Sequence, residues 1–425
     1  MQSGEQLKFA GEVLLDKVRI ITPSGFYQDI AGQVITVQLY EDLFSPFITG
    51  SLIVKESLDL INLFPFIGEE YLELEIRTPT LEKNNIKNTF YIYKMGNREL
   101  LGDRSVVYQL HFISIEAVAD LNKKISKSFT GKVSDMVQKF VTDKYDGMES
   151  TKSVNVEPTT NSTKYTSNYW SPVQNIMYLT DTAINVNGTP DFVFFENRDG
   201  FYFISLESLY SNNVFQEFTY DKYTRDDLPG GGSARNVQED YKRILSISIP
   251  TGFDYMDRIR SGMLSSKLIT YDVTKKTYTT KNYDMFKRFE KQKHLNKFPI
   301  NSNKSIFRNN ALIMNEYKAF ANHSGFGDVT NTRIIQERTS LMKLAEANKL
   351  EITVPGRADY TVGQKIAVVL NKIEPISDKS EDTTDKMFSG YYIIAAINHY
   401  VDREKHECVM EVIKDSSQMD MSKGK

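Results

Sequence analysis

Hydrophobic residues alternate with polar ones over much of the first 125 residues. In the segment YLELEIR (71–77), three aliphatic side chains alternate with three charged ones. A period of two places each set on its own face of a β-strand. Comparable short segments, rich in Val, Ile and Leu, follow one another at 13–21, 32–44, 47–57, 88–97 and 105–117. Six or so short strands with little helix predict an antiparallel barrel or sandwich.

The pattern changes after Leu121. Apolar residues spaced three, one and three apart predict an amphipathic helix over 132–144. Pro172 near the start of a second apolar stretch predicts another helix over 172–185. Two aromatic strands joined through Asp199 and Gly200 predict a hairpin, since glycine adopts positive φ without a steric penalty. Residues 126–205 are therefore predicted to form an inserted α+β domain.

Strand patterns return in the second half of the chain. The segment 257–284 is predicted to hold a helix end at 260–262, a strand, a lysine turn and a second strand. A helix is predicted over 331–350, and another around 310–322. Four strands are predicted near the end, at 351–356, 364–371, 390–401 and 406–414. Because four strands seldom bury both edges, strands near residues 215 and 246 are expected to complete this sheet.

The composition of the chain excludes some classes of function and identifies none. The 425 residues carry a net charge of −3, so no overall basic excess attracts nucleic acid or membrane. A single cysteine, Cys408, excludes an internal disulfide. No export signal or membrane-spanning segment is apparent, and no membrane anchoring is expected. The stretch GGGS (230–233) lacks the lysine of a phosphate-binding loop and is predicted to be a linker, and 374–386 a charged loop.

The candidate chemical groups do not converge on a catalytic set. If 402–405 form a turn, Val401 faces His406 and His399 faces Cys408 across two strands. A closed zinc site would need two more ligands, so a buried cross-strand pair without metal is the expectation. The acidic residues Glu69, Glu70, Glu73 and Glu75 fit either a glycosidase-type carboxylate pair or a solvated strand face, and the solvated face is favoured.

A bulky apolar corner interrupts the strands at LFSPF (43–47). Pro46 cannot donate to a β-ladder, so the segment is an edge, a bulge or a turn. Its phenylalanines either fold inward or form a docking surface. The candidate assembly interface consists of Leu43, Phe44, Phe47, Gly262 and Met263.

Several segments together resemble the baseplate central hub proteins of contractile-tailed bacteriophages. The opening, LYEDLFSPFITGSLIVKESLDLINLFPFIGEEYLELEIRTP, resembles theirs, and FDYMDRIRSGMLSSKLITYDVTKKTYTTKNYD resembles their middle segment. The segments GKVSDMVQKFV, YWSPVQNIMYLTDTAI and FVFFENRDGFYFISLESL are similar to the inserted domain of the family. The blocks 333–370 and 389–401 resemble its end. The resemblance covers nearly the whole chain in the same order.

The resemblance implies an α+β, mainly β fold with two tail-tube-like antiparallel β-barrel domains and inserted α+β domains. On this chain, the barrels would be 1–125 and, in two pieces, 206–262 with 339–415. The accessory parts would be 126–205 and 263–338, followed by a polar tail, 416–425.

The implied function is structural. Hubs of this kind form a homotrimer whose pseudo-sixfold ring joins a trimeric spike to the tail tube and starts tube assembly. The resemblance implies no catalytic residue, metal or cofactor. The expected partners are the spike, the tube protein, neighbouring baseplate proteins and a tape measure protein, with DNA only in transit through the lumen. The expected location is the virion tail baseplate, assembled in the host cytoplasm.

Three alternatives stay open from the sequence. One is the hub of a phage-tail-like bacteriocin or another contractile injection system. Another is a cell-wall hydrolase that acts through Glu69, Glu73 or Glu75. The third is a carbohydrate-binding β module, for which the aromatic content is the motive. Relatives in secretion systems fuse hub and spike, whereas this chain ends in a polar stretch, so a separate spike protein is expected.

Overall fold

A computed structural model describes most of the chain and is mainly β, as predicted. The predicted linker 230–233 lies outside the described residues, as does most of the loop 374–386. Side chains are described except in 271–272 and 310–316. The described residues are 7–57, 66–81, 85–102, 104–220, 237–250, 252–272, 276–302, 310–316, 334–372 and 384–421.

The first β unit is a run of antiparallel strands in the order β3-β4-β7-β6-β5-β1-β2. The alternation in β5 takes the predicted form: Leu72, Leu74 and Ile76 are fully buried while the charged residues between them are not. These side chains join a core of their own, which includes Leu39 and Phe112. The strands are β1 (Leu14–Ile21), β2 (Tyr27–Asp29), β3 (Val34–Asp42), β4 (Thr49–Glu56), β5 (Tyr71–Arg77), β6 (Ile86–Leu101) and β7 (Ser105–Ser114).

The second β unit contains the four strands predicted near the end of the chain. It also contains the two strands expected near residues 215 and 246. Strand β14 (Ser246–Ser248) extends the sheet beyond β19. Strand β13 (Gln216–Tyr220) pairs with β20 in parallel, a departure from an all-antiparallel unit. The remaining strands are β19 (Asn348–Pro355), β20 (Lys365–Leu370), β21 (Gly390–Asp402) and β22 (His406–Lys414).

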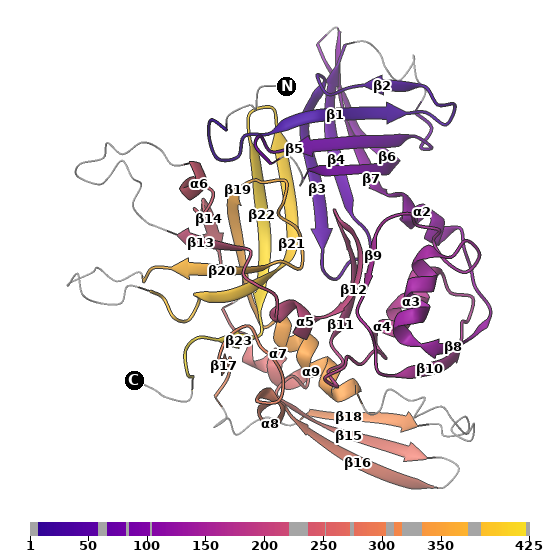
Figure 1. Ribbon diagram of the computed structural model, residues 1–425, viewed down its shortest axis with the longest axis vertical. Coiled ribbons are helices and arrows are strands. Elements are labelled where there is room, and N and C mark those ends of the chain that lie inside the picture. Colours follow the sequence, from indigo (N-terminus) through magenta and orange to yellow (C-terminus); the bar gives the residue numbers. More distant parts are fainter. Residues whose placement is uncertain are drawn as a thin grey trace, which may run out of the picture.

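The two β units share one continuous sheet. Residues 396–402 of β21 pair antiparallel with residues 36–42 of β3, and we call this pairing the β3–β21 seam. Figure 1 shows the strands of the first unit beside the long strands β21 and β22 of the second. The main path of paired strands runs from β14 to β2, and β20 and β13 branch from it at β21. An isolated bridge joins Thr219 of β13 to Arg243, shortly before β14. Among the described strands, no continuous ladder closes either unit into a barrel. The large antiparallel sheet is therefore confirmed, whereas two closed barrels are not seen.

The inserted residues fold around their own core. The helix α3 (Val133–Thr142) lies within its predicted range. The helix α4 (Pro172–Thr180) begins where Pro172 predicts, but it ends at Thr180 rather than at the predicted residue 185. Ser171 and Gln174 form a capping box, which satisfies backbone donors at the start of α4. The other elements are β8 (Ser128–Lys132), β9 (Val154–Val156), β10 (Ser162–Thr166), β11 (Phe192–Asn197) and β12 (Gly200–Ser205). The helix α2 (Ile115–Leu121) precedes the inserted residues, and α5 (Leu206–Tyr210) follows them and packs in the core of the second unit. The helix α2 was not predicted.

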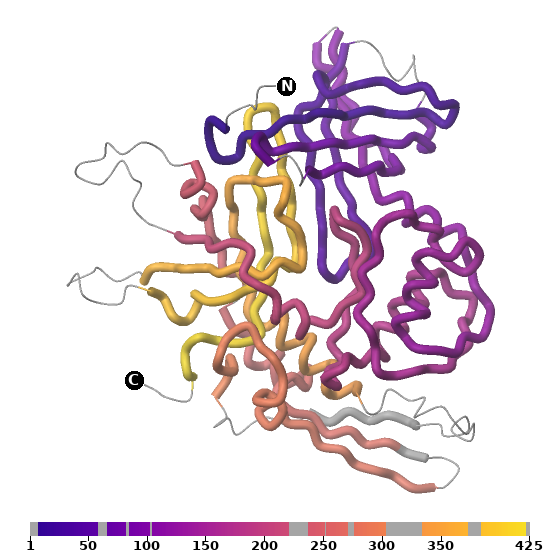
Figure 2. Tube along the Cα trace, in the orientation of Figure 1, coloured from indigo at the N-terminus to yellow at the C-terminus, as the bar shows by residue number. Residues whose placement is uncertain are grey.

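A small sheet and short helices lie between the second unit's two pieces, and Figure 2 traces their path. The predicted strand–turn–strand is β15 (Ser265–Asp272) and β16 (Thr277–Asp284). The other elements are α6 (Val237–Asp240), α7 (Tyr255–Arg260), α8 (Met285–Phe289), β17 (Phe298–Pro299), β18 (Asn310–Glu316), α9 (Ile335–Ala345) and β23 (Ser416–Ser417).

Three predictions in this part differ from the structure. The predicted helix at 310–322 is wrong over 310–316, where β18 pairs with β15, because a short apolar run does not separate strand from helix. The helix α9 ends before Asn348, which already belongs to β19. The predicted polar tail begins too early, since Ser416 and Ser417 are buried and pair with β17.

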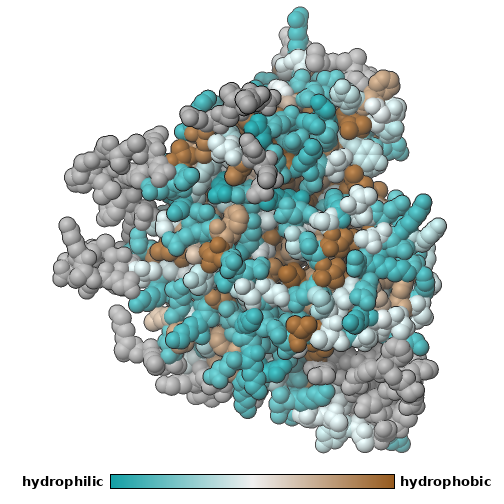
Figure 3. All heavy atoms as spheres, in the orientation of Figure 1, coloured by the Kyte–Doolittle hydropathy of each residue, from teal (hydrophilic) through white to brown (hydrophobic). Residues whose placement is uncertain are grey.

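The surface is mainly polar on the face seen in Figure 3, where apolar residues form small separate groups. Among the described residues, no helix is long and apolar enough to cross a bilayer.

Candidate functional site at the junction of three units

The hairpin β11–β12 lies between the inserted domain and the second β unit and packs against both. Phe192 and Phe194 enter the core of the inserted domain, whereas Val193 and Phe195 enter the core of the second unit. Every residue of β11 is therefore buried. Gly200 at the turn has φ +133, and a Cβ there would overlap the backbone of Ser153, so the turn requires glycine. This packing places the turn end of the hairpin, residues 196–200, against the first β unit. We call these residues the hairpin tip.

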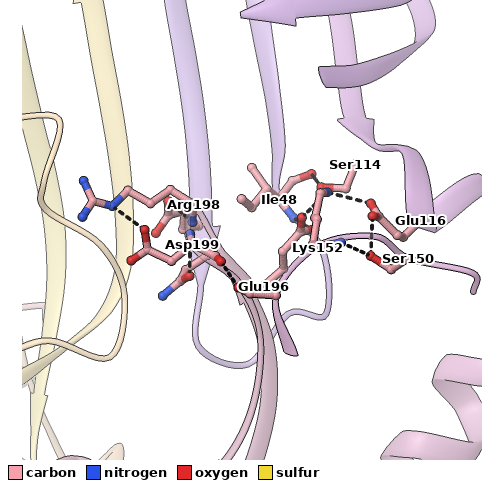
Figure 4. Close-up of polar contacts among 11 residues, drawn as sticks. Ile48, Ser114, Glu116, Ser150, Lys152, Glu196, Arg198 and Asp199 are labelled. Atoms are coloured by element: carbon pink, nitrogen blue, oxygen red, sulfur yellow. Dashed lines mark hydrogen bonds and ion pairs between the residues drawn. The ribbon is translucent and has the colours of Figure 1, made fainter. Parts of the chain in front are cut away.

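A buried charge cluster ties the hairpin tip to the first unit (Figure 4). The Lys152 ammonium donates to Glu116 Oε2 and to Glu196 Oε1, both at 2.6 Å. The second oxygen of Glu196 accepts the backbone N–H of Ile48 at 3.1 Å. Ser150 donates to Glu116 Oε1 at 2.7 Å. We call Glu116, Lys152 and Glu196, with the Ile48 amide, the junction cluster.

In the junction cluster, each charged group offsets part of the cost of burying its oppositely charged partner. Glu196 is fully buried, and burial raises the pKa of its carboxyl, while Lys152 opposes that shift. Burial disfavours the charged form of Lys152, yet Glu196 and Glu116 raise the pKa of its ammonium. A charge removed from such a cluster leaves its partners buried without compensation.

A second contact joins the hairpin tip to both β units. The Arg198 amide donates to Glu41 Oε1 on β3 at 3.2 Å, and its guanidinium donates to the carbonyl of Ala358. Thr361 Oγ1 and the amide of Val362 donate to the other Glu41 oxygen. Burial raises the pKa of Glu41 to about 7, although these hydrogen bonds and Arg198 favour its charged form. The hairpin tip therefore contacts the chain on both sides of the β3–β21 seam.

The five residues of the candidate assembly interface lie within or beside the cores of this chain. Leu43 is fully buried in the core of the second unit, and Phe44 packs against that core. Phe47 packs against the inserted domain, with its ring 6.4 Å from Phe201 in an edge-to-face arrangement. Met263 is 1% exposed, and Gly262, at φ +77, follows the end of α7. The corner joins three parts of one chain, and its role between chains stays a prediction.

The acidic segment 69–75 is engaged in structural contacts. Glu73 and Glu75 lie 3.2 and 3.7 Å from the Lys17 ammonium on the neighbouring strand β1. Glu70 accepts the backbone N–H groups of Ile67 and Gly68. These contacts favour the solvated strand face, with ion pairs, over a hydrolytic pair.

The predicted cross-strand register at the last hairpin is confirmed. His399 faces Cys408, with Nδ1 3.3 Å from Sγ, and Val401 faces His406. The structure adds a third group, because the His406 ring also reaches Cys408.

Sequence reasoning missed the residues of the junction. Glu196 and Arg198 flank a hairpin turn, where charged residues are ordinarily solvated, and Lys152 lies in a polar stretch without a pattern of apolar residues. Glu41 follows the strand alternation of β3 and is 1% exposed. The one available signal was this placement of an acidic residue at a position that the alternation assigns to the interior.

Comparison with known proteins finds likeness in structure alone. No family model matches the sequence, and no curated protein matches it. A tail protein from Neisseria meningitidis MC58 aligns over 94% of this chain and 96% of its own, with a TM-score of 0.55 and 11% identity. The 43 kDa tail protein of prophage MuSo2 from Shewanella oneidensis aligns over 94% and 98%, with a TM-score of 0.57 and 8% identity. The chain thus has the fold of phage tail proteins over nearly its whole length, and at this level of fold the resemblance seen in the sequence is confirmed.

Proposed function

We propose that this chain is the central hub of a contractile-tail baseplate, a structural protein that works as a homotrimer. The observation that carries the proposal is the pairing of two β units, edge to edge, within one chain. The shared fold with two tail proteins, one of them from a prophage, agrees with it. The hub would join a trimeric spike to the tail tube and provide the surface on which the tube starts.

Symmetry explains why two units in one chain are useful. A spike with threefold symmetry and a tube with sixfold symmetry must meet at one layer of the tail. Three copies of a two-unit chain present three identical chains to one side and six similar β units to the other. A closed cyclic assembly needs only one heterologous interface, repeated until the ring shuts. In this proposal each unit completes a tube-like barrel in the ring.

The junction fits this role because it holds the two units and the inserted domain at fixed angles. A ring closes only if the angle between its units is reproducible from copy to copy. The β3–β21 seam sets that angle by backbone pairing, and the buried contacts of Glu41 and Glu196 brace it. Besides spike and tube, the proposed partners are neighbouring baseplate proteins and a tape measure protein, in the virion tail assembled in the host cytoplasm, with DNA passing through the lumen.

The mass of the complex with its spike tests the proposal. We expect light scattering on this chain, co-purified with the spike protein encoded in the same genome, to give three copies of the chain. A stable dimer, or a ring of six copies, would refute the architecture. A genome without capsid genes around this gene would assign the same hub to a phage-tail-like bacteriocin.

The proposal also makes the chain a protein without catalytic activity. The carboxylates of Glu73 and Glu75 are committed to Lys17 on a sheet face. We therefore expect the turbidity of a cell-wall suspension to stay constant after addition of the purified protein. A fall in turbidity that Glu73→Gln abolishes would replace the structural function with a hydrolytic one.

A further inference from the structure

Three metal-binding side chains converge in the interior of the second β unit. His399 Nδ1 lies 3.0 Å from His406 Nε2, and Cys408 Sγ lies 3.3 and 3.4 Å from these two atoms. All three residues are fully buried. Among the described residues, this is the one group of His, Cys and carboxylate ligands that lies close enough together to hold an ion.

The arrangement follows from strand geometry. His399 and Cys408 are directly opposed on β21 and β22. His406 lies two residues before Cys408 on the same strand, so its side chain projects from the same face. Backbone hydrogen bonds fix its position: its N–H donates to Gly11 and its carbonyl accepts from Gly356. A Cβ at Gly356 would overlap the His406 ring, so glycine makes room for it.

The three facing atoms of the trio, His399 Nδ1, His406 Nε2 and Cys408 Sγ, lie in the sheet interior within hydrogen-bond distance of one another. The outer ring nitrogens, His399 Nε2 and His406 Nδ1, have no hydrogen-bond partner among the described residues. A neutral imidazole with its proton on the outer nitrogen presents a lone pair to the centre of the trio, and this is the form that binds a cation.

The separations of the three ligand atoms, 3.0–3.4 Å, are slightly shorter than those around a zinc ion. Bonds of about 2.0–2.3 Å to two nitrogens and one sulfur in a tetrahedron place the ligand atoms roughly 3.3–3.6 Å apart. The observed triangle is close to that size before any ion is bound. Two imidazoles and a thiolate form a borderline-soft donor set, which suits zinc better than magnesium or calcium. The fourth position would go to water or to a backbone carbonyl.

We propose that His399, His406 and Cys408 form a structural binding site for a zinc-class cation. On binding, the Cys408 thiol loses its proton to solvent and the metal–sulfur bond forms, with no change in oxidation state. The ion would therefore cross-link β21 and β22 within the second unit. His399 also pairs with Leu39 of β3, so this cross-link lies beside the β3–β21 seam.

Metal content and spectroscopy of the full chain test this site. After metal removal and reloading with Zn²⁺, we expect about one ion per chain by plasma mass spectrometry and a higher melting temperature. Co²⁺ in place of Zn²⁺ should give a thiolate charge-transfer absorption band. Cys408→Ser should abolish this band and lower the zinc content at least tenfold, whereas the control His111→Asn, on β7 and outside the trio, should retain both.

Two results would overturn the proposal. One is a wild-type protein that retains no zinc and whose melting temperature is unchanged by Zn²⁺. The other is a Cys408→Ser variant that binds zinc as wild type does. If Cys408→Ser fails to fold, the cobalt spectrum of the wild-type chain decides alone, because only a thiolate ligand produces that band and the chain has a single cysteine.

Discussion

At the scale of single residues, the junction depends on a few buried charges that satisfy one another. Lys152 lies between two carboxylates, and Glu41 accepts hydrogen bonds from three donors. Such groups contribute little net stability when complete, but they become costly when one partner is lost. These groups therefore determine the arrangement of the units more than they contribute to the free energy of folding.

Removal of the Lys152 charge should destabilise the fold. We expect Lys152→Met to lower the free energy of unfolding by about 3 kcal/mol, because Glu116 and Glu196 then share a buried site without a cation. Urea denaturation measures the change. The matched control is Lys139→Met, since Lys139 pairs with Asp146 at an exposed position and its loss should cost at most about 1 kcal/mol. Equal losses in both variants would mean that the junction cluster has no special role.

Glu41 should make stability depend on pH. Burial raises its pKa from 4.5 to about 7 in the folded chain, so the folded state holds a proton that the unfolded state has released between these values. Stability attributable to Glu41 is thus full below pH 4.5 and falls as the pH rises to 7, by on the order of 3 kcal/mol. The Glu41→Gln variant should lack this component. Identical pH dependence of unfolding in variant and wild type would contradict the assignment.

At the scale of elements, the periodicity of apolar residues predicted those strands and helices that form from a local pattern of apolar and polar positions. The strands of both β units, the helices α3 and α4 and the hairpin β11–β12 follow the pattern of apolar residues. What the pattern could not supply is which elements meet. Val193 and Phe195 look like one face of a hairpin, but only the tertiary fold shows that this face belongs to another unit. The helix predicted at 310–322 is wrong over 310–316, because four consecutive apolar residues, 311–314, carry no period.

Substitutions in the LFSPF corner (43–47) can show whether its phenylalanines pack within the chain or bind a partner. Phe47 is half-buried against Phe201, so Phe47→Ala should lower the free energy of unfolding by about 2 kcal/mol, less than for a fully buried ring. Phe26→Ala is the control, because its side chain is 68% exposed and should cost little. Thermal denaturation of both variants measures the difference. If Phe47→Ala leaves the melting temperature unchanged but impairs assembly, the corner is a docking surface instead.

At the scale of the whole molecule, the continuous sheet is the feature that matters. Two units with separate cores share one sheet through β3 and β21, and an inserted domain braces them from one side. Neither unit closes into a barrel among the described residues. In the proposed ring of three chains, a neighbouring chain would cover the edge strand β2, which would limit wrong pairing of an open edge. Only the resemblance of whole segments pointed to this arrangement, because composition and periodicity carry no information on contacts between chains.

The most direct test of the central claim is electron microscopy of the complex with the co-purified spike. The structure proposed here predicts a ring of three chains, in which six β units surround one lumen and the β3–β21 seam lies within each chain. Alternate boundaries between units should be this seam, and the others should be contacts between chains. A ring built from six chains, or three chains whose β units do not line a common lumen, would contradict the account.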